Sequence, residues 1–143
     1  MSTMSNFPNG FPNGITIRGT PVTQLYPGRV FWVTNSSTTL SETSVGGADG
    51  NAGTYQRPMA TIDATINKCV AGRGDIIVLG PGHAESVTAA TTINLDVAGV
   101  AIIGLGVGTS RPTLTFTIAN TATIPVSAAN ISIKNVRFVA NFL

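Results

Sequence analysis

Short apolar runs broken by glycine, asparagine and proline fill the chain from residue 75 to its C-terminal end. These runs are rich in isoleucine, valine and threonine, which are typical of β-strands. Because turn-forming residues interrupt them so often, each run is long enough for a short strand but not for a helix. A similar aromatic and β-branched run lies nearer the N-terminus. The predicted strands cover residues 30–33, 76–79, 100–103, 113–118 and 131–134.

One segment has the period of an amphipathic helix instead. Apolar residues recur at three- and four-residue steps between Pro58, which suits a first helical turn, and Gly72, which ends a helix. We therefore predict a helix over residues 58–70. Cys69 falls on its apolar face, so we interpret this residue as a buried small hydrophobic side chain rather than a nucleophile.

An internal repeat relates residues 93–107 to residues 124–138 without gaps, at an offset of 31 residues. A repeat of this length in short strands is typical of a solenoid, in which the inward residues of successive coils stack on one another. A β-sandwich also has short strands, but it gives no reason for side-chain type and turn chemistry to repeat together. The matched positions are Ile93/Ile124, Leu95/Val126, Val100/Ile131, Ile102/Ile133, Leu105/Val136 and Val107/Phe138, with Gly99/Asn130 and Gly104/Asn135 as residues that tolerate left-handed backbone.

The composition adds that this chain carries unusually little charge. Charged residues make up 10% of the 143 residues, whereas an ordinary soluble domain has about 25%. The hydrophobic content of 43% excludes a disordered chain, and the length suits a single domain. No stretch approaches the roughly 18 apolar residues of a membrane span, and the basic residues are scattered, so we expect neither a membrane nor a nucleic-acid partner. We infer that something covers much of the surface.

No catalytic, metal or cofactor site is predicted. Cys69 is the only cysteine, which excludes an internal disulfide framework and a cysteine-based zinc site. We expect the single histidine, His83, to be a hydrogen-bonded turn residue, and Asp75 to bond backbone N–H groups at a corner. Glu85 and Asp96 could approach each other across coils, but two carboxylates at unknown separation are weak evidence for acid–base catalysis.

Two segments, Pro58-Met-Ala-Thr-Ile62 and Gly74-Asp-Ile-Ile-Val78, follow one another in an order that resembles right-handed parallel β-helix proteins of the pectate-lyase-like superfamily. In that superfamily a short helix caps the first coil, and a Gly-Asp strand and a Pro-Gly turn follow it. Residues 130–138 are similar to its repeating coil motif. The resemblance covers about residues 53–143. It implies an all-β fold, a right-handed parallel β-helix with a short N-terminal capping helix and an extended N-terminal arm.

The N-terminal arm contains the tandem repeat Phe7-Pro-Asn-Gly10 and Phe11-Pro-Asn-Gly14. Each copy predicts a tight turn that presents one phenylalanine. A disordered leader and an arm whose phenylalanines dock on a partner both fit this pattern. Together with Pro27-Gly-Arg-Val-Phe-Trp32, the repeat resembles the leader of phage structural proteins. We therefore divide the chain into a virion-anchoring arm and loop, residues 1–53, and a body, residues 54–143.

The resemblance implies a non-enzymatic structural protein of a tailed bacteriophage virion, of the capsid decoration, cement or head-fibre type, without cofactor or metal. We expect synthesis in the host cytoplasm, because the N-terminus lacks the pattern of a signal peptide, and a homotrimer that contacts the major capsid protein or neighbouring copies. Two alternatives stay open: the N-terminal part of a tail spike or fibre protein with receptor-binding or polysaccharide-degrading activity further along, and a small carbohydrate-active enzyme or adhesin. The predicted partner-binding residues are Phe7, Phe11, Phe31, Trp32, Phe142 and Leu143.

The last predicted strand ends without a polar capping segment. We therefore expect an exposed strand edge and an exposed apolar ladder at this end, which invite pairing with other strands. Either another chain covers this end or the native protein continues with more coils.

Overall fold

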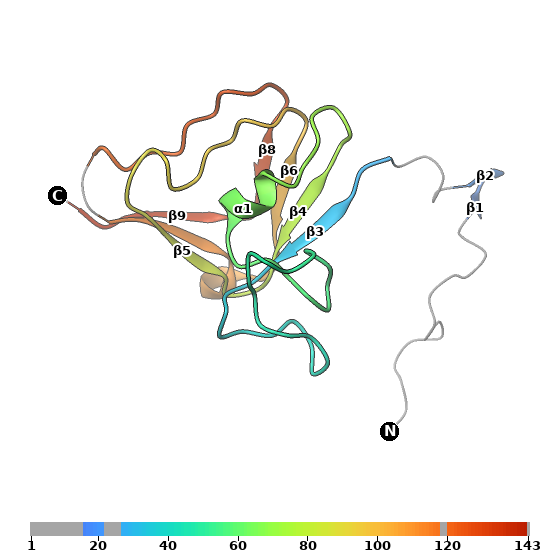
Figure 1. Cartoon of the computed structure of the whole chain (residues 1–143), viewed down its shortest axis with the longest axis horizontal. Coiled ribbons are helices and arrows are strands. Elements are labelled where there is room, and N and C mark those ends of the chain that lie inside the picture. The colour runs from blue at the N-terminus through green and yellow to red at the C-terminus, as the bar shows by residue number, and fades with distance from the viewer. Residues whose placement is uncertain (1–15, 22–26, 118–119, 143) are drawn as a thin grey trace.

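The computed structural model describes residues 16–21, 27–117 and 120–142. Its body contains two parallel sheets that share one apolar core (Figure 1). The four-stranded sheet has the order β3 (Val30–Val33), β4 (Ile76–Leu79), β6 (Ala101–Gly104) and β8 (Ser132–Lys134). The three-stranded sheet has the order β5 (Ala84–Val87), β7 (Thr113–Phe116) and β9 (Arg137–Ala140).

Successive strand pairs form layers of the body. β4 and β5 form one layer, β6 and β7 the next, and β8 and β9 the last, because the chain passes from one sheet to the other before it starts a new layer. Alternate residues of each strand point into the core. In the four-stranded sheet one inward row consists of Phe31, Ile77, Ile102 and Ile133, which are partners in register.

The prediction of a closed right-handed parallel β-helix is wrong. The described residues form two small sheets with strands of three or four residues, and no closed solenoid. On the remaining side only an isolated bridge pairs Leu95 with Val126. A third sheet is disfavoured there because Pro125 has no N–H to donate and the Asn94 N–H donates to the Asp63 carboxylate instead of a strand.

The stacking predicted from the repeat is confirmed only in part. Ile102 lies opposite Ile133 in adjacent strands, and Leu95 lies opposite Val126, each 31 residues apart. Phe138, however, is the partner of Leu114 and not of Val107. The register changes because the connection from β6 to β7, residues 105–112, includes the short 3-10 helix Gly108–Ser110, whereas β8 continues into β9 through residues 135–136 alone.

The predicted helix is real but shorter than expected. Helix α1 covers Ile62–Ile66, and its N-cap is Thr61, whose side chain accepts a hydrogen bond from the Ala64 N–H. Pro58 does not start it, because Met59 pairs with Val33 as an isolated bridge. After Ile66 the backbone continues in turns. The 58–70 periodicity therefore combines a bridge that buries Met59, a helix, and a following segment that buries Cys69 and leaves Val70 exposed.

The N-terminal hairpin consists of β1 (Thr16–Ile17) and β2 (Thr20–Pro21), which are antiparallel. Arg18 and Gly19 between them both have positive φ, as a two-residue type I′ turn requires. The hairpin lies apart from the two sheets (Figure 1). Among the described residues no helix is both long and apolar enough to cross a membrane.

Candidate functional site

On β3, β4 and β6 the outward side of the four-stranded sheet is apolar, like its inward side, whereas β8 continues the same rows with the exposed Ser132 and Lys134. We call this surface the outer apolar face. Its side chains form two rows that cross β3, β4 and β6 in register. Val30 is 46% exposed, and the others are half-buried by one another and by their neighbours. The face consists of Val30, Trp32, Ile76, Val78, Ala101 and Ile103, none of which carries a charge.

The outward side of the three-stranded sheet has a different character. β5 and β7 place Ala84, Ser86, Thr113 and Thr115 there, opposite the buried Val87 and Leu114 of the core. Small and polar residues are what a sheet face in water carries. The two sheets therefore differ in their outward chemistry although they share one core.

This difference indicates that the outer apolar face is built for burial. Parallel strands covered on both faces consist of nearly continuous apolar runs, whereas strands with one face in water alternate. The run Ile76-Ile-Val-Leu79 belongs to the first kind, and Thr113-Leu-Thr-Phe116 belongs to the second. Yet the core covers only the inward side of the four-stranded sheet. The outer apolar face thus has the composition of a buried surface without a cover in the described chain.

Trp32 is held in place at one side of this face. Its ring meets the Tyr55 ring edge-on, with centroids 4.9 Å apart and planes at 78°, a favourable aromatic geometry. The Tyr55 hydroxyl donates to the Leu40 carbonyl at 2.8 Å. The long loop between β3 and α1 therefore supports the indole without covering it completely, since Trp32 stays half-buried.

The last layer forms a second apolar surface, which we call the open end. It consists of β8, β9 and the segment 120–131 that leads into them. Burial falls sharply here: Leu114 is 3% exposed and its partner Phe138 is 50% exposed, while Leu95 is 2% exposed and its partner Val126 is 60% exposed. The inward residues of this layer point into the core but have nothing beyond them in the described chain.

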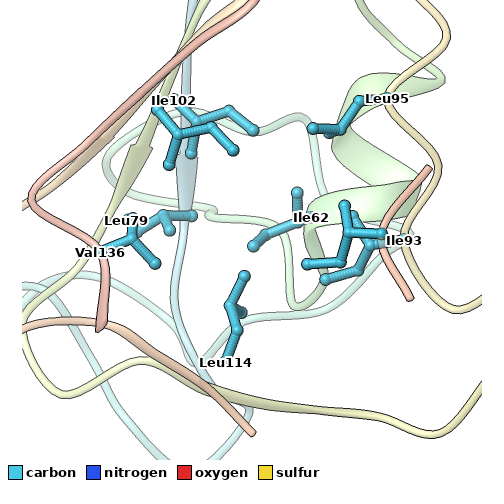
Figure 2. A pocket seen from close by; sticks show the side chains of 9 residues that line it. Ile62, Leu79, Ile93, Leu95, Ile102, Leu114 and Val136 are labelled. Atoms are coloured by element: carbon cyan, nitrogen blue, oxygen red, sulfur yellow. The ribbon is translucent and has the colours of Figure 1, made fainter. Parts of the chain in front are cut away.

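A small apolar cavity lies beneath the open end (Figure 2). Its volume of about 10 Å³ is at the lower limit for one water molecule, and apolar cavities of this kind stay dry. Three of its lining residues, Ile124, Ile133 and Val136, are only half-buried because they belong to the last layer. The other six, which α1 and the earlier layers supply, are buried: Ile62, Leu79, Ile93, Leu95, Ile102 and Leu114.

The opposite end of the body is closed by the chain itself. The Trp32 N–H donates to the Gly53 carbonyl, and the Met59 N–H donates to the Trp32 carbonyl, both at 2.8 Å. At the start of β5 the Asn35 side chain both donates to the Ala84 carbonyl at 2.8 Å and accepts from the Ala84 N–H at 2.9 Å. The outer edge of β3 is thus paired with backbone groups of the same chain, and the outer edge of β5 is paired with the side-chain amide of Asn35.

Asp75 joins segments near this closed end. Its carboxylate accepts hydrogen bonds from the backbone N–H groups of Arg29 and Val70 at 2.8 Å and from Nε and Nη2 of Arg73 at 2.7 Å. Burial alone disfavours the charge, but the hydrogen bonds from Arg73, Arg29 and Val70 outweigh that cost and lower the pKa of Asp75 to about 2. The predicted role of Asp75 as an acceptor of backbone N–H groups is confirmed.

A buried pair of ionisable residues lies at the start of α1. The Glu85 carboxylate accepts the Ile62 N–H at 2.7 Å and lies 2.8 Å from His83 Nε2. His83 is 1% exposed, so its expected role as a hydrogen-bonded residue is confirmed. His83 Nδ1 is buried without a partner in the described structure. Both side chains face inward, so this pair positions α1 and presents no reactive group to solvent.

The other candidate carboxylate, Asp96, has different surroundings. It lies on an open polar pocket of about 520 Å³ and accepts a hydrogen bond from the Asn94 side chain at 3.3 Å, whereas Glu85 is bonded to α1. The hypothesis that these carboxylates approach each other finds no support in these contacts. No group of three or more metal-ligating side chains occurs in the described ranges. The pocket is lined by Asp63, Asn67, Ala90, Thr91, Asn94, Asp96, Pro125 and Ser127.

Cys69 is buried, as predicted, and its thiol donates to the Thr65 carbonyl at 3.4 Å. Burial and the nearby Asp75 charge raise the pKa of the Cys69 thiol to about 11. Because the thiolate is the reactive form, this residue is a poor nucleophile.

The predicted partner-binding residues fall in separate places. Trp32 lies on the outer apolar face, and Phe142 is half-buried near the open end. Phe31 is 6% exposed and packs in the core of its own chain, so its ring is not accessible to a partner. Phe7, Phe11 and Leu143 lie outside the described residues.

The outer apolar face was not predicted from the sequence. Its signal was present, because two strands of one sheet lack the polar alternation seen in the other sheet. Only the register of β3, β4 and β6 shows that these residues share one surface. No family model, curated protein or solved structure matches this chain. The resemblances described above therefore stay predictions.

Proposed function

We propose that this chain is a non-enzymatic structural protein of a tailed-phage virion, of the decoration, cement or head-fibre type, and that its copies assemble through the outer apolar face. The observation that carries the proposal is this charge-free surface, which spans three strands and has the composition of a sheet interior. The resemblance of the arm to phage leaders supports the virion location. The scarcity of charge, 10% of residues, also fits a protein whose surfaces are largely in contact.

Val78→Glu tests the assembly. Val78 lies near the middle of the outer apolar face, and an unpaired carboxylate buried in an interface costs several kcal/mol. We expect the wild-type chain to form a trimer in sedimentation velocity, and Val78→Glu to weaken association on the order of a hundredfold or more. Ser86→Glu, on the outward side of the three-stranded sheet, is the matched control and leaves the trimer intact.

Two outcomes contradict the proposed assembly. One is a wild-type chain that stays monomeric at high concentration, and the other is an equal effect of the two substitutions. Circular dichroism of each variant shows whether it remains folded. Mass spectrometry of purified particles of the virus that encodes the chain then tests the virion location, since a structural component is present there in stoichiometric amount.

The polar pocket favours a second candidate function, an adhesin that binds a carbohydrate. Its carboxylates, amides and hydroxyls provide the donors and acceptors that a hydroxyl-rich ligand requires, and its volume is about 520 Å³. Asp96→Ala removes an exposed acceptor without touching the core. If the pocket binds glycans, a glycan array probed with wild-type protein gives signals that Asp96→Ala loses. An array without signal for the wild type contradicts this function.

A further inference from the structure

The open end presents the only sheet edges of the described body that the chain leaves without a partner. β8 pairs with β6 alone and β9 pairs with β7 alone. At the opposite end, backbone groups of the same chain pair with the outer edge of β3, and the Asn35 side chain pairs with the outer edge of β5. The Ser132 N–H donates back to Val100 and the Arg137 N–H donates back to Pro112. Because alternate residues of a strand direct their N–H and C=O groups to opposite sides, Ile133 and Phe138 direct theirs to the free edges.

The side chains at this edge require an added strand to be apolar on its inward side. Ile133 and Val136 are half-buried over the small cavity, and Phe138 is 50% exposed. In the preceding layer the partner of Ile133, Ile102, is 2% exposed because β8 covers it. One further strand beside β8, with apolar residues on its inward side, would cover Ile133 in the same way.

The charges at the open end indicate which kind of strand pairs with β8. After Asp96 the chain contains three basic residues, Arg111, Lys134 and Arg137, and no acidic residue. Lys134 is exposed on β8 and Arg137 is half-buried on β9, and neither forms an ion pair in the described structure. A second copy placed edge to edge would bring these cations together, and lysine at a strand edge opposes such pairing. A strand with acidic residues on its outward side would instead pair with them.

We propose that the open end binds an extended segment of a different polypeptide, with alternating apolar and acidic residues, as an additional strand beside β8. Its apolar side chains cover Ile133 and the cavity, and its acidic side chains lie next to Lys134. This inference deepens the proposed assembly function by naming the chemistry of a partner. It concerns the backbone edge of β8 and not the apolar side chains of the outer apolar face, so the two proposals are tested by different readouts: exchange of the Ile133 N–H and sedimentation.

The test uses the full chain with a strand attached through a flexible Gly-Ser linker after Leu143, which raises the local concentration of a weakly binding segment. One version carries Val-Glu-Val-Glu-Val and the matched version carries Val-Lys-Val-Lys-Val. Amide hydrogen exchange by NMR reports whether the Ile133 N–H becomes protected. We expect the acidic strand to slow exchange at Ile133 at least about tenfold relative to the basic strand. The Ile102 N–H, inside the sheet, is the internal reference.

Charge reversal distinguishes charge-specific binding from nonspecific hydrophobic association. In the double variant Lys134→Glu/Arg137→Glu the preference should invert, so that the basic strand protects Ile133 better. Equal protection by both strands, or protection by neither, overturns the proposal. Concentration-dependent protection of Ile133 in the chain without a tether also overturns it, because a second copy is then the occupant. The trimer test with Val78→Glu uses the chain without a tether and with Lys134 in place, because Lys134 is in register with Ile103 of the outer apolar face, so none of these outcomes decides it.

Discussion

Four of the six acidic side chains, Asp49, Asp63, Asp75 and Glu85, accept hydrogen bonds from backbone N–H groups far away in the sequence or at the start of α1. Such acceptors satisfy N–H donors that strand pairing and turn hydrogen bonds leave free in the segments between the short strands. Of these four, Asp75 is buried, Asp63 and Glu85 are half-buried and Asp49 is exposed, so acidic side chains act as backbone acceptors both inside the body and at its surface.

Asp75→Asn tests this role through pH. The pKa of Asp75 is about 2 in the folded protein and about 3.9 in an unfolded chain. Its ionised form therefore stabilises the fold above pH 4, and this contribution disappears as the pH falls from about 4 to 2. We expect Asp75→Asn to lower the free energy of unfolding by on the order of 2 kcal/mol at pH 7, measured by urea unfolding.

The difference between wild type and Asp75→Asn should shrink steadily as urea unfolding is repeated down to pH 2. Asp96→Asn serves as the control, since its carboxylate is exposed and bonded only to the Asn94 side chain. A difference that stays constant with pH would show that size or packing, and not ionisation, makes Asp75 important.

Local sequence predicted Asp75 as a turn acceptor because Asp commonly bonds backbone N–H groups in turns. It could not predict the two bonds between Asn35 and Ala84, which are 49 residues apart. The same limit applies to Glu85 and Ile62. A polar side chain that replaces a strand partner leaves no pattern in its own neighbourhood, so only the folded structure reveals it.

At the scale of elements, apolar pattern predicted strands well where it was strong. All five predicted strands occur, with ends shifted by at most a few residues. β5 and β9 were missed because Ala84-Glu-Ser-Val87 and Arg137-Phe-Val-Ala140 contain polar residues on one side and a small residue at one end. Their neighbours impose the strand conformation on them through in-register pairing with β7.

The helix, in contrast, was predicted to be longer than it is. Met59, Ile62, Ile66 and Cys69 follow this helical spacing and are all buried, but Val70 is 50% exposed and only Ile62–Ile66 is helical. Burial determines which side of the segment is apolar, whereas the pairing partners of its backbone determine its conformation. Met59 has such a partner in β3, and the Thr61 cap fixes where the helix begins.

At the scale of the whole molecule, the body is closed at one end and open at the other. The repeat of 31 residues predicted that layers stack, and the stacking of Ile102 on Ile133 confirms this. It also suggested a closed coil, which the irregular segments around Asn94 and Pro125 prevent. Neither surface proposed for assembly follows from the repeat itself. The outer apolar face depends on which side of a sheet the core covers, and the open end depends on which strands lack a neighbour among the described residues.

The asymmetry of the two ends predicts unequal costs for the same substitution. Ile102 and Ile133 are partners in register, but Ile102 is 2% exposed and Ile133 is half-buried. We expect Ile102→Ala to lower the free energy of unfolding by about 2–5 kcal/mol and Ile133→Ala by less than half as much. Urea unfolding of the two variants measures both values. Attaching the acidic strand should raise the cost of Ile133→Ala and leave that of Ile102→Ala unchanged, because only Ile133 gains a cover. Equal costs without the strand would mean that the open end is already covered.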